Sequence, residues 1–386
     1  MESLIEKYEG KLIEANLVDE GKALFGAVNV KPVWNRSDRR TATLARLLDD
    51  LSIVTIICAE PAEPYRSMVK HIAASSGDCV KPHDNETRTF LHDIPVVGGL
   101  TSLELKSALS HRKGAVSKEG IVIATGTVSP EQAYVTFSSI CFAFYVKYLG
   151  DYLLRAREGN ITRREQNIFR KIVQKIPEGP KGDVRLMRAP FESEQKVLRA
   201  IEEAGAKTVH SGLVDSSFGN ISYRYGGILY ISQTGCPLDE LAGHIDPCPL
   251  DGSSCVAITA SSELPAHLTI VTENPVSAVL HGHPKFSVIM SLLCEKADCN
   301  QRGTRCHHCP EVRYIEGIPI VAGDVGAGLR GIHRAVQPLM AKHRGVVVYG
   351  HGVFSTGRYD FNEAYDEMAR IENTCRNRYF NATDVS

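Results

Sequence analysis

A short segment rich in proline and glycine interrupts the middle of this 386-residue chain. Residues 177–182, Pro-Glu-Gly-Pro-Lys-Gly, place two prolines and two glycines within six positions, which is typical of a linker. The segment leaves enough chain for a domain on either side, since a domain commonly holds about 100–200 residues. We therefore predict two domains, at residues 1–180 and 188–386.

The composition is that of a globular protein with balanced charge. Hydrophobic residues make up 43%, and 44 Lys and Arg against 45 Asp and Glu give a net charge of −1. This balance gives no support for a general nucleic-acid binder. The longest apolar stretch, residues 133–154, is interrupted by Lys147 and Asp151, which disfavours a membrane span. The first ten residues are charged from the second position, unlike a signal peptide. We expect a cytoplasmic protein without nucleic-acid or membrane partners.

The first half of the chain alternates helical and strand patterns, which predicts a separate α/β domain. Ser37 is expected to cap the first of these helices and Pro61 to open the second. Helices are expected at residues 37–51, at 61–74, after Thr101 and from Pro130, with buried strands at 53–58 and 120–124. The role of this domain stays open between substrate specificity, a second activity and oligomer contacts.

The second half begins with a predicted helix at residues 192–204 and then becomes richer in strands. Strands are expected at residues 222–225, 228–232, 255–259, 276–282, 318–322 and 345–349.

The clearest candidate site lies at residues 279–284, Val-Leu-His-Gly-His-Pro. An apolar run leads into His281 and His283, and alternate residues of a strand lie on the same face. Pro284 then begins a helix, so the pair is expected at a strand end, where a site can open. One interpretation is a metal site, because neutral imidazoles bind zinc; the other is a pair of satisfied core or surface histidines.

A third histidine follows another apolar strand. Residues 345–352, Gly-Val-Val-Val-Tyr-Gly-His-Gly, place His351 between two glycines, which permit close approach of backbone or ligand. Together with His281 and His283 it would leave a fourth metal position open, as in catalytic zinc sites. By itself, His351 could be a turn histidine.

Other polar residues are candidates for proton transfer and anion binding. Glu263 could act as a general base near a metal, or it could belong to the local capping of a helix. Small residues and amide or hydroxyl donors at residues 218–222 and 233–235 could bind an anion, or could form ordinary turns. The candidates there are Gly219, Asn220, Thr234 and Gly235.

In order and spacing, these pieces resemble the class II aldolase/adducin family. The pieces are Asn220-x-Ser222, Thr234-Gly235, Ser261-Ser262-Glu263, His281-x-His283 and Gly350-His351-Gly352, followed by Gly357-Arg358 and Asn362-Glu363-Ala364. The resemblance covers about residues 192–379. It departs from the family pattern at Gln233, where the family usually has a proline.

The resemblance implies a class II aldolase-like α/β/α domain with a central, mainly antiparallel sheet. It implies that His281, His283 and His351 bind Zn²⁺ or another divalent transition metal, since three imidazoles suit zinc, manganese, cobalt and iron. It also implies that Glu263 works as acid/base. The positions implied to hold a substrate phosphate are Gly219, Asn220, Thr234, Gly235, Ser261 and Ser262. Adducins, which are not catalysts, lack the metal histidines, so this chain resembles the enzymes.

The implied function is a metal-dependent lyase that cleaves or forms a carbon–carbon bond in a small, phosphorylated keto or hydroxy compound. Tyr359, Tyr365 or Tyr379 could protonate a departing aldehyde, and each could equally be a packed aromatic. A decarboxylase or sugar-phosphate epimerase is the alternative on the same scaffold. A non-catalytic, adducin-like binding protein is the alternative of another class. Family aldolases are usually symmetric tetramers, so the resemblance also implies a homo-oligomer.

Four of the 11 cysteines cluster at residues 294–309. Cys306 and Cys309 have the spacing of a zinc half-site, and Cys299 lies seven residues upstream in a polar stretch that resembles an insertion. A second, structural metal at Cys299, Cys306 and Cys309 is one interpretation, and free thiols in a loop are the other. A disulfide is disfavoured in a reducing compartment.

Overall fold

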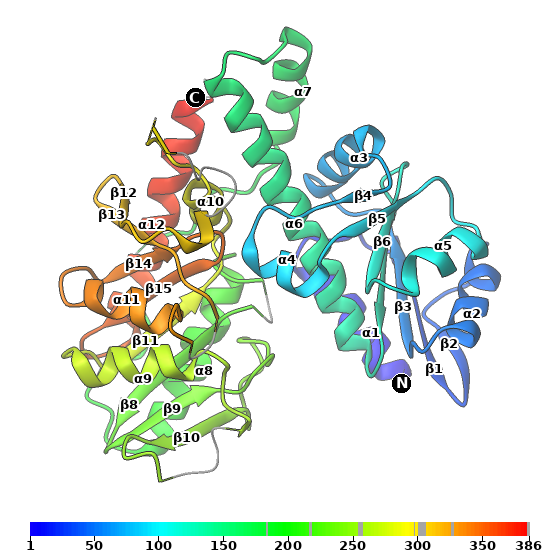
Figure 1. The fold of residues 1–386 in the computed structure, drawn as a ribbon. Helices are drawn as coiled ribbons and strands as arrows, with labels where there is room; N and C mark the ends of the chain where they lie inside the picture. The colour runs from blue at the N-terminus through cyan, green and yellow to red at the C-terminus, as the bar shows by residue number, and fades with distance from the viewer. Residues whose placement is uncertain are drawn as a thin grey trace. The chain divides into compact units, whose positions relative to one another are not determined.

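A computed structural model describes residues 1–182, 184–215, 218–253, 258–296, 298–299, 306–325 and 328–383. The chain forms two compact units, Met1–Pro177 and Glu178–Ser386 (Figure 1). Within the described ranges, no helix combines the length and the apolar character that crossing a membrane requires.

The first unit alternates helices and strands. Its helices are α1 (Glu2–Glu14), α2 (Thr41–Asp50), α3 (Tyr65–Ser75), α4 (Asn85–Leu91), α5 (Ser102–Leu109), α6 (Pro130–Arg157) and α7 (Arg163–Val173). Its strands are β1 (Leu24–Asn29), β2 (Lys31–Trp34), β3 (Thr55–Ala59), β4 (Cys79–Val80), β5 (Ile94–Val97), β6 (Gly114–Ser117) and β7 (Val122–Gly126).

Helices cover both faces of the seven-stranded sheet in this unit, whose order is β2-β1-β3-β7-β6-β5-β4 (Figure 1). Neighbouring strands are antiparallel except β5 and β6, which are parallel. Leu44 and Leu47 of α2 pack with Leu105 of α5 against Ile56 and Ile123 of the sheet. Because β3 is buried along its whole length, alternate residues supply a core on each face.

Two predicted helix starts in this unit are wrong by about four residues. Ser37 does not cap α2; the helix begins at Thr41, because the Asp38 carboxylate holds the backbone N–H and the guanidinium of Arg40 in a preceding turn. Pro61 does not open α3, which begins at Tyr65 after a second proline, Pro64, at the N-cap. The predicted starts after Thr101 and at Pro130 are confirmed.

The second unit is built around one large sheet. Its helices are α8 (Glu194–His210), α9 (Leu264–Glu273), α10 (Lys285–Ser291), α11 (Ile332–Met340) and α12 (Phe361–Ala382), with a 3₁₀ turn at Cys306–His308. Its strands are β8 (Asn220–Tyr225), β9 (Ile228–Ser232), β10 (Ile245–Pro249), β11 (Ala278–Gly282), β12 (Arg313–Ile315), β13 (Ile318–Val321), β14 (Gly345–Val348) and β15 (Gly352–Gly357).

The eight strands of this sheet follow the order β10-β9-β8-β11-β15-β14-β13-β12 and are antiparallel except for the pair β13–β14. One face packs against α9 and α11, with Ile270, Val336 and Phe354 in the shared core. Contacts of α8, α10 and α12 cover the other face. The predicted α/β/α architecture with a mainly antiparallel sheet is therefore confirmed. Most of the predicted strand at 255–259 lies outside the described residues.

Candidate metal centre

The three histidines predicted to bind a metal meet at the centre of the second sheet. His281 belongs to β11 and lies opposite Asn220 of β8 and Phe354 of β15. His283 directly follows β11, and His351 lies in the turn between β14 and β15. All three are at least 96% buried. Two neighbouring strand ends thus bring together residues that are 70 positions apart in the sequence.

The ring nitrogens of the three histidines converge. The Nε2 atoms of His281 and His283 lie 2.9 Å apart, and the candidate ligand atoms of all three lie within 4.8 Å of one another. Gly352 permits this approach, because a Cβ at that position would lie 2.7 Å from His283 Cδ2 and 2.9 Å from His281 Cε1.

The donor set fits a metal ion. His281 Nδ1 lies 3.0 Å from the carbonyl oxygen of Val353, and donation to that oxygen leaves Nε2 with a lone pair. Burial, followed by the neighbouring imidazoles, holds the pKa of His283 well below its usual value, so this ring is neutral. Its Nδ1 is buried without a hydrogen-bond partner among the described residues. Neutral imidazoles that turn nitrogens toward one another in a buried site are suited to a shared cation.

Glu263 contributes a carboxylate to the same centre. It forms the N-cap of α9, and its Oε1 and Oε2 lie 2.8 Å from His351 Nε2 and 3.3 Å from His281 Nε2. Asn220 donates its amide N–H to Oε2 at 3.1 Å. Burial acts to raise the pKa of Glu263, but His281, His351 and Asn220 outweigh it and lower the pKa below its usual range. Glu263 is therefore ionised at neutral pH.

The residues predicted to bind phosphate are brought together only in part. The turn at Thr234 lies beside the Ser261 segment, because Thr234 Oγ1 donates to the Ala260 carbonyl at 2.8 Å and Ser261 N donates to the Ser232 carbonyl at 3.0 Å. Thr234, Gly235 and Ser262 are exposed, whereas Ser261 is buried. Gln233 donates to the Asp246 carboxylate at 2.8 Å.

The other two predicted phosphate residues lie deeper. Gly219 has a φ of +136°, and a Cβ there would lie 2.7 Å from the His281 carbonyl oxygen, so glycine allows β8 to begin close to β11. The side chain of Asn220 is buried and is bonded to Glu263 and to His267.

Sequence reasoning missed two residues that organise this centre. His267, in the apolar helix α9, is completely buried and is bonded to Asn220 and Ser222. Glu372, in the charged helix α12, accepts hydrogen bonds from Phe286 N, Ser287 N and Ser287 Oγ at 2.7–2.9 Å. These bonds fix the start of α10, directly after His283. Each is a single polar residue within a helical pattern, and such a residue does not by itself indicate a role at a site.

The three tyrosines considered as proton donors differ in exposure. Tyr365 is buried and its hydroxyl donates to Ser211 Oγ at 2.6 Å. Tyr379 is buried against Phe286 and Phe380. Tyr359 is 61% exposed, which makes it the one of the three that is open to a ligand or to a second copy of the chain.

The cysteine cluster does not form a second centre in the part of the chain that the structure describes. There, His281, His283 and His351 are the only group of three or more His, Cys, Asp or Glu side chains whose ligand atoms converge. Cys299, Cys306 and Cys309 are thiols of intermediate exposure that form no disulfide in the described part of the chain.

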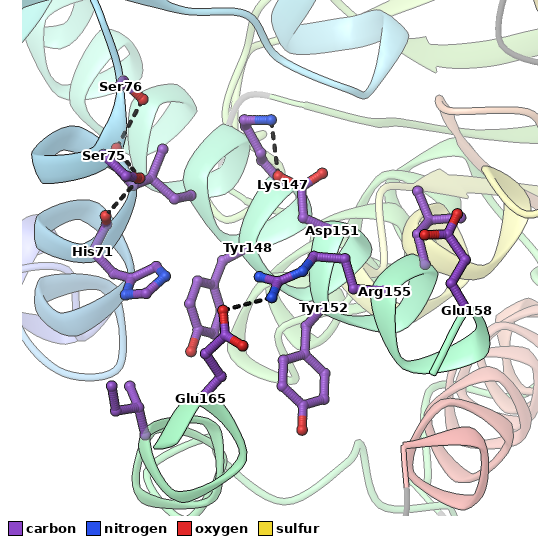
Figure 2. Close-up of a pocket in the computed structure, with 13 residues that line it drawn as sticks. His71, Ser75, Ser76, Lys147, Tyr148, Asp151, Tyr152, Arg155, Glu158 and Glu165 are labelled. Atoms are coloured by element: carbon purple, nitrogen blue, oxygen red, sulfur yellow. Dashed lines mark hydrogen bonds and ion pairs between the residues drawn. The ribbon is translucent and has the colours of Figure 1, made fainter. Parts of the chain in front are cut away.

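The first unit contains a cavity of about 440 Å³ between α3, α6 and α7. Figure 2 shows its charged side chains pairing with one another: Lys147 Nζ lies 2.9 Å from Asp151 Oδ2, and Arg155 Nη2 lies 2.5 Å from Glu165 Oε1. The Tyr148 ring lies among them in the same view. None of the residues predicted to bind metal or phosphate lines this cavity.

Residues 199–379 match the family described as class II aldolase and adducin N-terminal domain. Comparison with curated proteins gave no significant match. The fold and the buried histidine centre define an α/β/α domain with a candidate metal site. The family match identifies this part of the chain: residues 199–379 belong to the class II aldolase/adducin family, as the sequence predicts.

Solved structures that resemble the chain include L-fuculose-1-phosphate aldolase from Thermus thermophilus, with 22% identity, a TM-score of 0.39, and coverage of 48% of this chain and 93% of that one. YgbL from Klebsiella pneumoniae, provisionally assigned as an aldolase, epimerase or decarboxylase, has 24% identity, a TM-score of 0.40, and coverage of 48% and 89%. A sugar-phosphate aldolase from Thermotoga maritima has 17% identity, a TM-score of 0.35, and coverage of 50% and 97%.

Proposed function

We propose that residues 188–386 form the catalytic domain of a metal-dependent, aldolase-type lyase that acts on a small, phosphorylated keto or hydroxy compound. The observation that carries the proposal is the buried convergence of His281, His283 and His351 beside the ionised Glu263. An adducin-like binding protein would not need three buried imidazoles and a carboxylate directed at one point.

Under this proposal, His281, His283 and His351 hold Zn²⁺ or another divalent metal. Such a metal supplies Lewis-acid polarisation of the substrate oxygens that bind it. Glu263 takes a proton from the substrate as the carbon–carbon bond breaks or forms and returns it afterwards, which requires the carboxylate form that its surroundings favour. The surrounding burial excludes bulk water from this proton transfer.

The exposed edge formed by Thr234, Gly235 and Ser262 is our proposed position for the substrate phosphate, with Ser261 behind it. Small residues leave room for an anion to approach backbone N–H groups there. Gly219 would act indirectly, by letting β8 approach β11. Tyr359 is the proposed relay for this proton at the aldehyde oxygen, which gains a proton in condensation and loses one in cleavage, because its side chain is exposed.

Proton exchange tests the proposal before the natural substrate is identified. The Zn²⁺-loaded protein is incubated in D₂O with dihydroxyacetone phosphate and, separately, with unphosphorylated dihydroxyacetone, and NMR follows the loss of the C–H signals. We expect exchange that is faster with the phosphorylated compound and that is absent in His283→Ala. Retro-aldol cleavage of a panel of ketose 1-phosphates then separates a lyase from an epimerase or a decarboxylase. No exchange and no cleavage with any divalent metal would favour a binding protein.

A further inference from the structure

A buried chain of hydrogen bonds runs from Ser222 to Glu263. Ser222 Oγ lies 2.7 Å from His267 Nδ1, and His267 Nε2 lies 2.5 Å from Asn220 Oδ1. Asn220 Nδ2 in turn donates to Glu263 Oε2 at 3.1 Å, and Glu263 Oε1 lies 2.8 Å from His351 Nε2. All five side chains are at least 94% buried, so water does not compete for these contacts.

With Asn220 Nδ2 donating to Glu263 Oε2, one arrangement of protons gives each of the three contacts from Ser222 to Glu263 a donor and an acceptor. The Asn220 oxygen then faces His267 Nε2, which must carry the ring proton. Burial lowers the pKa of His267 to about 3 against the opposing effect of Glu263, so the ring is neutral and has one N–H. Its Nδ1 therefore accepts from the Ser222 hydroxyl.

Two elements, β8 and α9, supply the residues of this chain of hydrogen bonds, and the spacing of those residues in the sequence places them on facing sides. Asn220 and Ser222 are two apart on β8 and lie on the same face of the strand. Glu263 caps α9 and His267 follows four residues later, on the same side of the helix. The edge of the His267 ring packs against Phe354, whose own ring stacks on His281 at a centroid distance of 4.1 Å. The strand and the helix thus meet through two pairs of polar side chains.

We infer that His267 is a positioning residue for Glu263, that Asn220 transmits its effect, and that Ser222 donates to the other ring nitrogen of His267. The inference rests on the proposed function for the role of Glu263, but not for the hydrogen-bond chain itself. Without the His267 N–H, the Asn220 amide is free to rotate and the carboxylate loses its fixed partner. The Asn220 amide thus uses one N–H for Glu263 and its oxygen for His267, and the second N–H of its NH₂ group is the donor for the phosphate contact that the family resemblance implies.

Two substitutions of His267 separate positioning from simple packing. In His267→Gln, the side-chain amide can place an N–H where Nε2 lies, whereas in His267→Asn the shorter amide reaches only the position of Nδ1. We expect His267→Gln to keep kcat for dihydroxyacetone phosphate exchange within about threefold of wild type. We expect His267→Asn to lower kcat about 10–100-fold, the scale of a misplaced catalytic group, with KM and zinc content unchanged. Equal losses in both variants, or an unimpaired His267→Asn, would overturn the inference.

A measurement without substrate keeps the inference testable if the exchange reaction fails or a variant does not fold. The ¹⁵N chemical shifts of the His267 ring in the zinc-loaded wild type report which nitrogen carries the proton. We expect the Nε2–H tautomer in the wild type and also in Ser222→Ala, because Asn220 Oδ1 still accepts from Nε2 there. An Nδ1–H tautomer in the wild type would overturn the inference whatever the activity. The predicted tautomer without exchange activity would uphold the hydrogen-bond chain and count against the proposed function alone.

Discussion

Replacing Gly352 with alanine is expected to disturb the candidate metal centre without removing any of its ligands. An added Cβ would lie 2.3 Å from the Gly282 carbonyl oxygen, as well as closer than 3.0 Å to carbons of His281 and His283. Since a Cβ essentially never lies closer than 3.0 Å to another heavy atom, the carbonyl would have to retreat by about 0.7 Å.

Gly282 lies between the two histidines in the sequence, so its displacement moves both imidazoles. A metal site holds its ligand distances to within about 0.2 Å, well below the shift that the substitution requires. We expect zinc to bind about 10–100-fold more weakly to Gly352→Ala, as when residues that support metal ligands are changed. Overpacking should also lower the free energy of unfolding by about 1–3 kcal/mol.

Competition with a chromophoric chelator measures the zinc dissociation constant, and urea unfolding of the metal-free protein measures stability. Gly328→Ala is the matched control, because a Cβ at that position meets nothing within 4 Å. We expect the control to bind zinc as the wild type does. A zinc affinity in Gly352→Ala within about twofold of the control would refute the reasoning.

Three further substitutions have defined outcomes. Glu263→Gln should keep zinc, by elemental analysis, and lose about 10²–10⁴-fold in proton exchange, because an amide cannot accept the proton; normal exchange would remove Glu263 from this role. Burial raises the pKa of Asp84 to about 6, so its native carboxyl holds a proton that the unfolded chain releases, and stability falls as pH rises from about 4 to 6. Asp84→Asn should remove this slope, so the difference in unfolding free energy from wild type should change by about 2 kcal/mol between pH 4 and 7 in urea titrations; a constant difference would contradict it. Glu372→Gln places an NH₂ group against either the Phe286 N–H or the Ser287 N–H and hydroxyl, and should cost about 1–3 kcal/mol in urea unfolding; unchanged stability would show that these bonds are dispensable.

The parts of the centre that could be predicted from the sequence are those with a local pattern. His281 and His283 alternate at the end of an apolar run that the structure confirms as β11, with His283 directly after the strand, and His351 follows an apolar run that the structure confirms as β14. The two-residue repeat of a strand is enough to place two side chains on one face. The family resemblance added the order in which these pieces occur, and the match over residues 199–379 confirms it.

The parts that could not be predicted depend on contacts between distant segments. His267 lies in an apolar helix pattern, and its partners Asn220 and Ser222 are 45–47 residues away in the sequence. Glu372 lies in a charged helix that resembles a solvent-exposed one, yet it contacts Phe286, 86 residues away. Strand order sets these contacts, and periodicity carries no information about which strands become neighbours.

The helix starts that were wrong have a local cause of a different kind. At α2, an ion pair between Asp38 and Arg40 forms a turn where the cap of the helix was expected. At α3, the later of two prolines is at the N-cap. In each case two residues within a short segment could begin the helix, and side-chain pairing or packing determines which of them does.

Metal content per chain tests the central claim most directly. Elemental analysis is made on the wild type and on the double variant His281→Ala/His283→Ala, each purified with added Zn²⁺ and then dialysed, with thermal unfolding as the check that both are folded. The account predicts that the double variant loses one metal per chain relative to the wild type. Equal metal content in the two folded proteins would contradict the metal centre, and with it the proposed lyase mechanism.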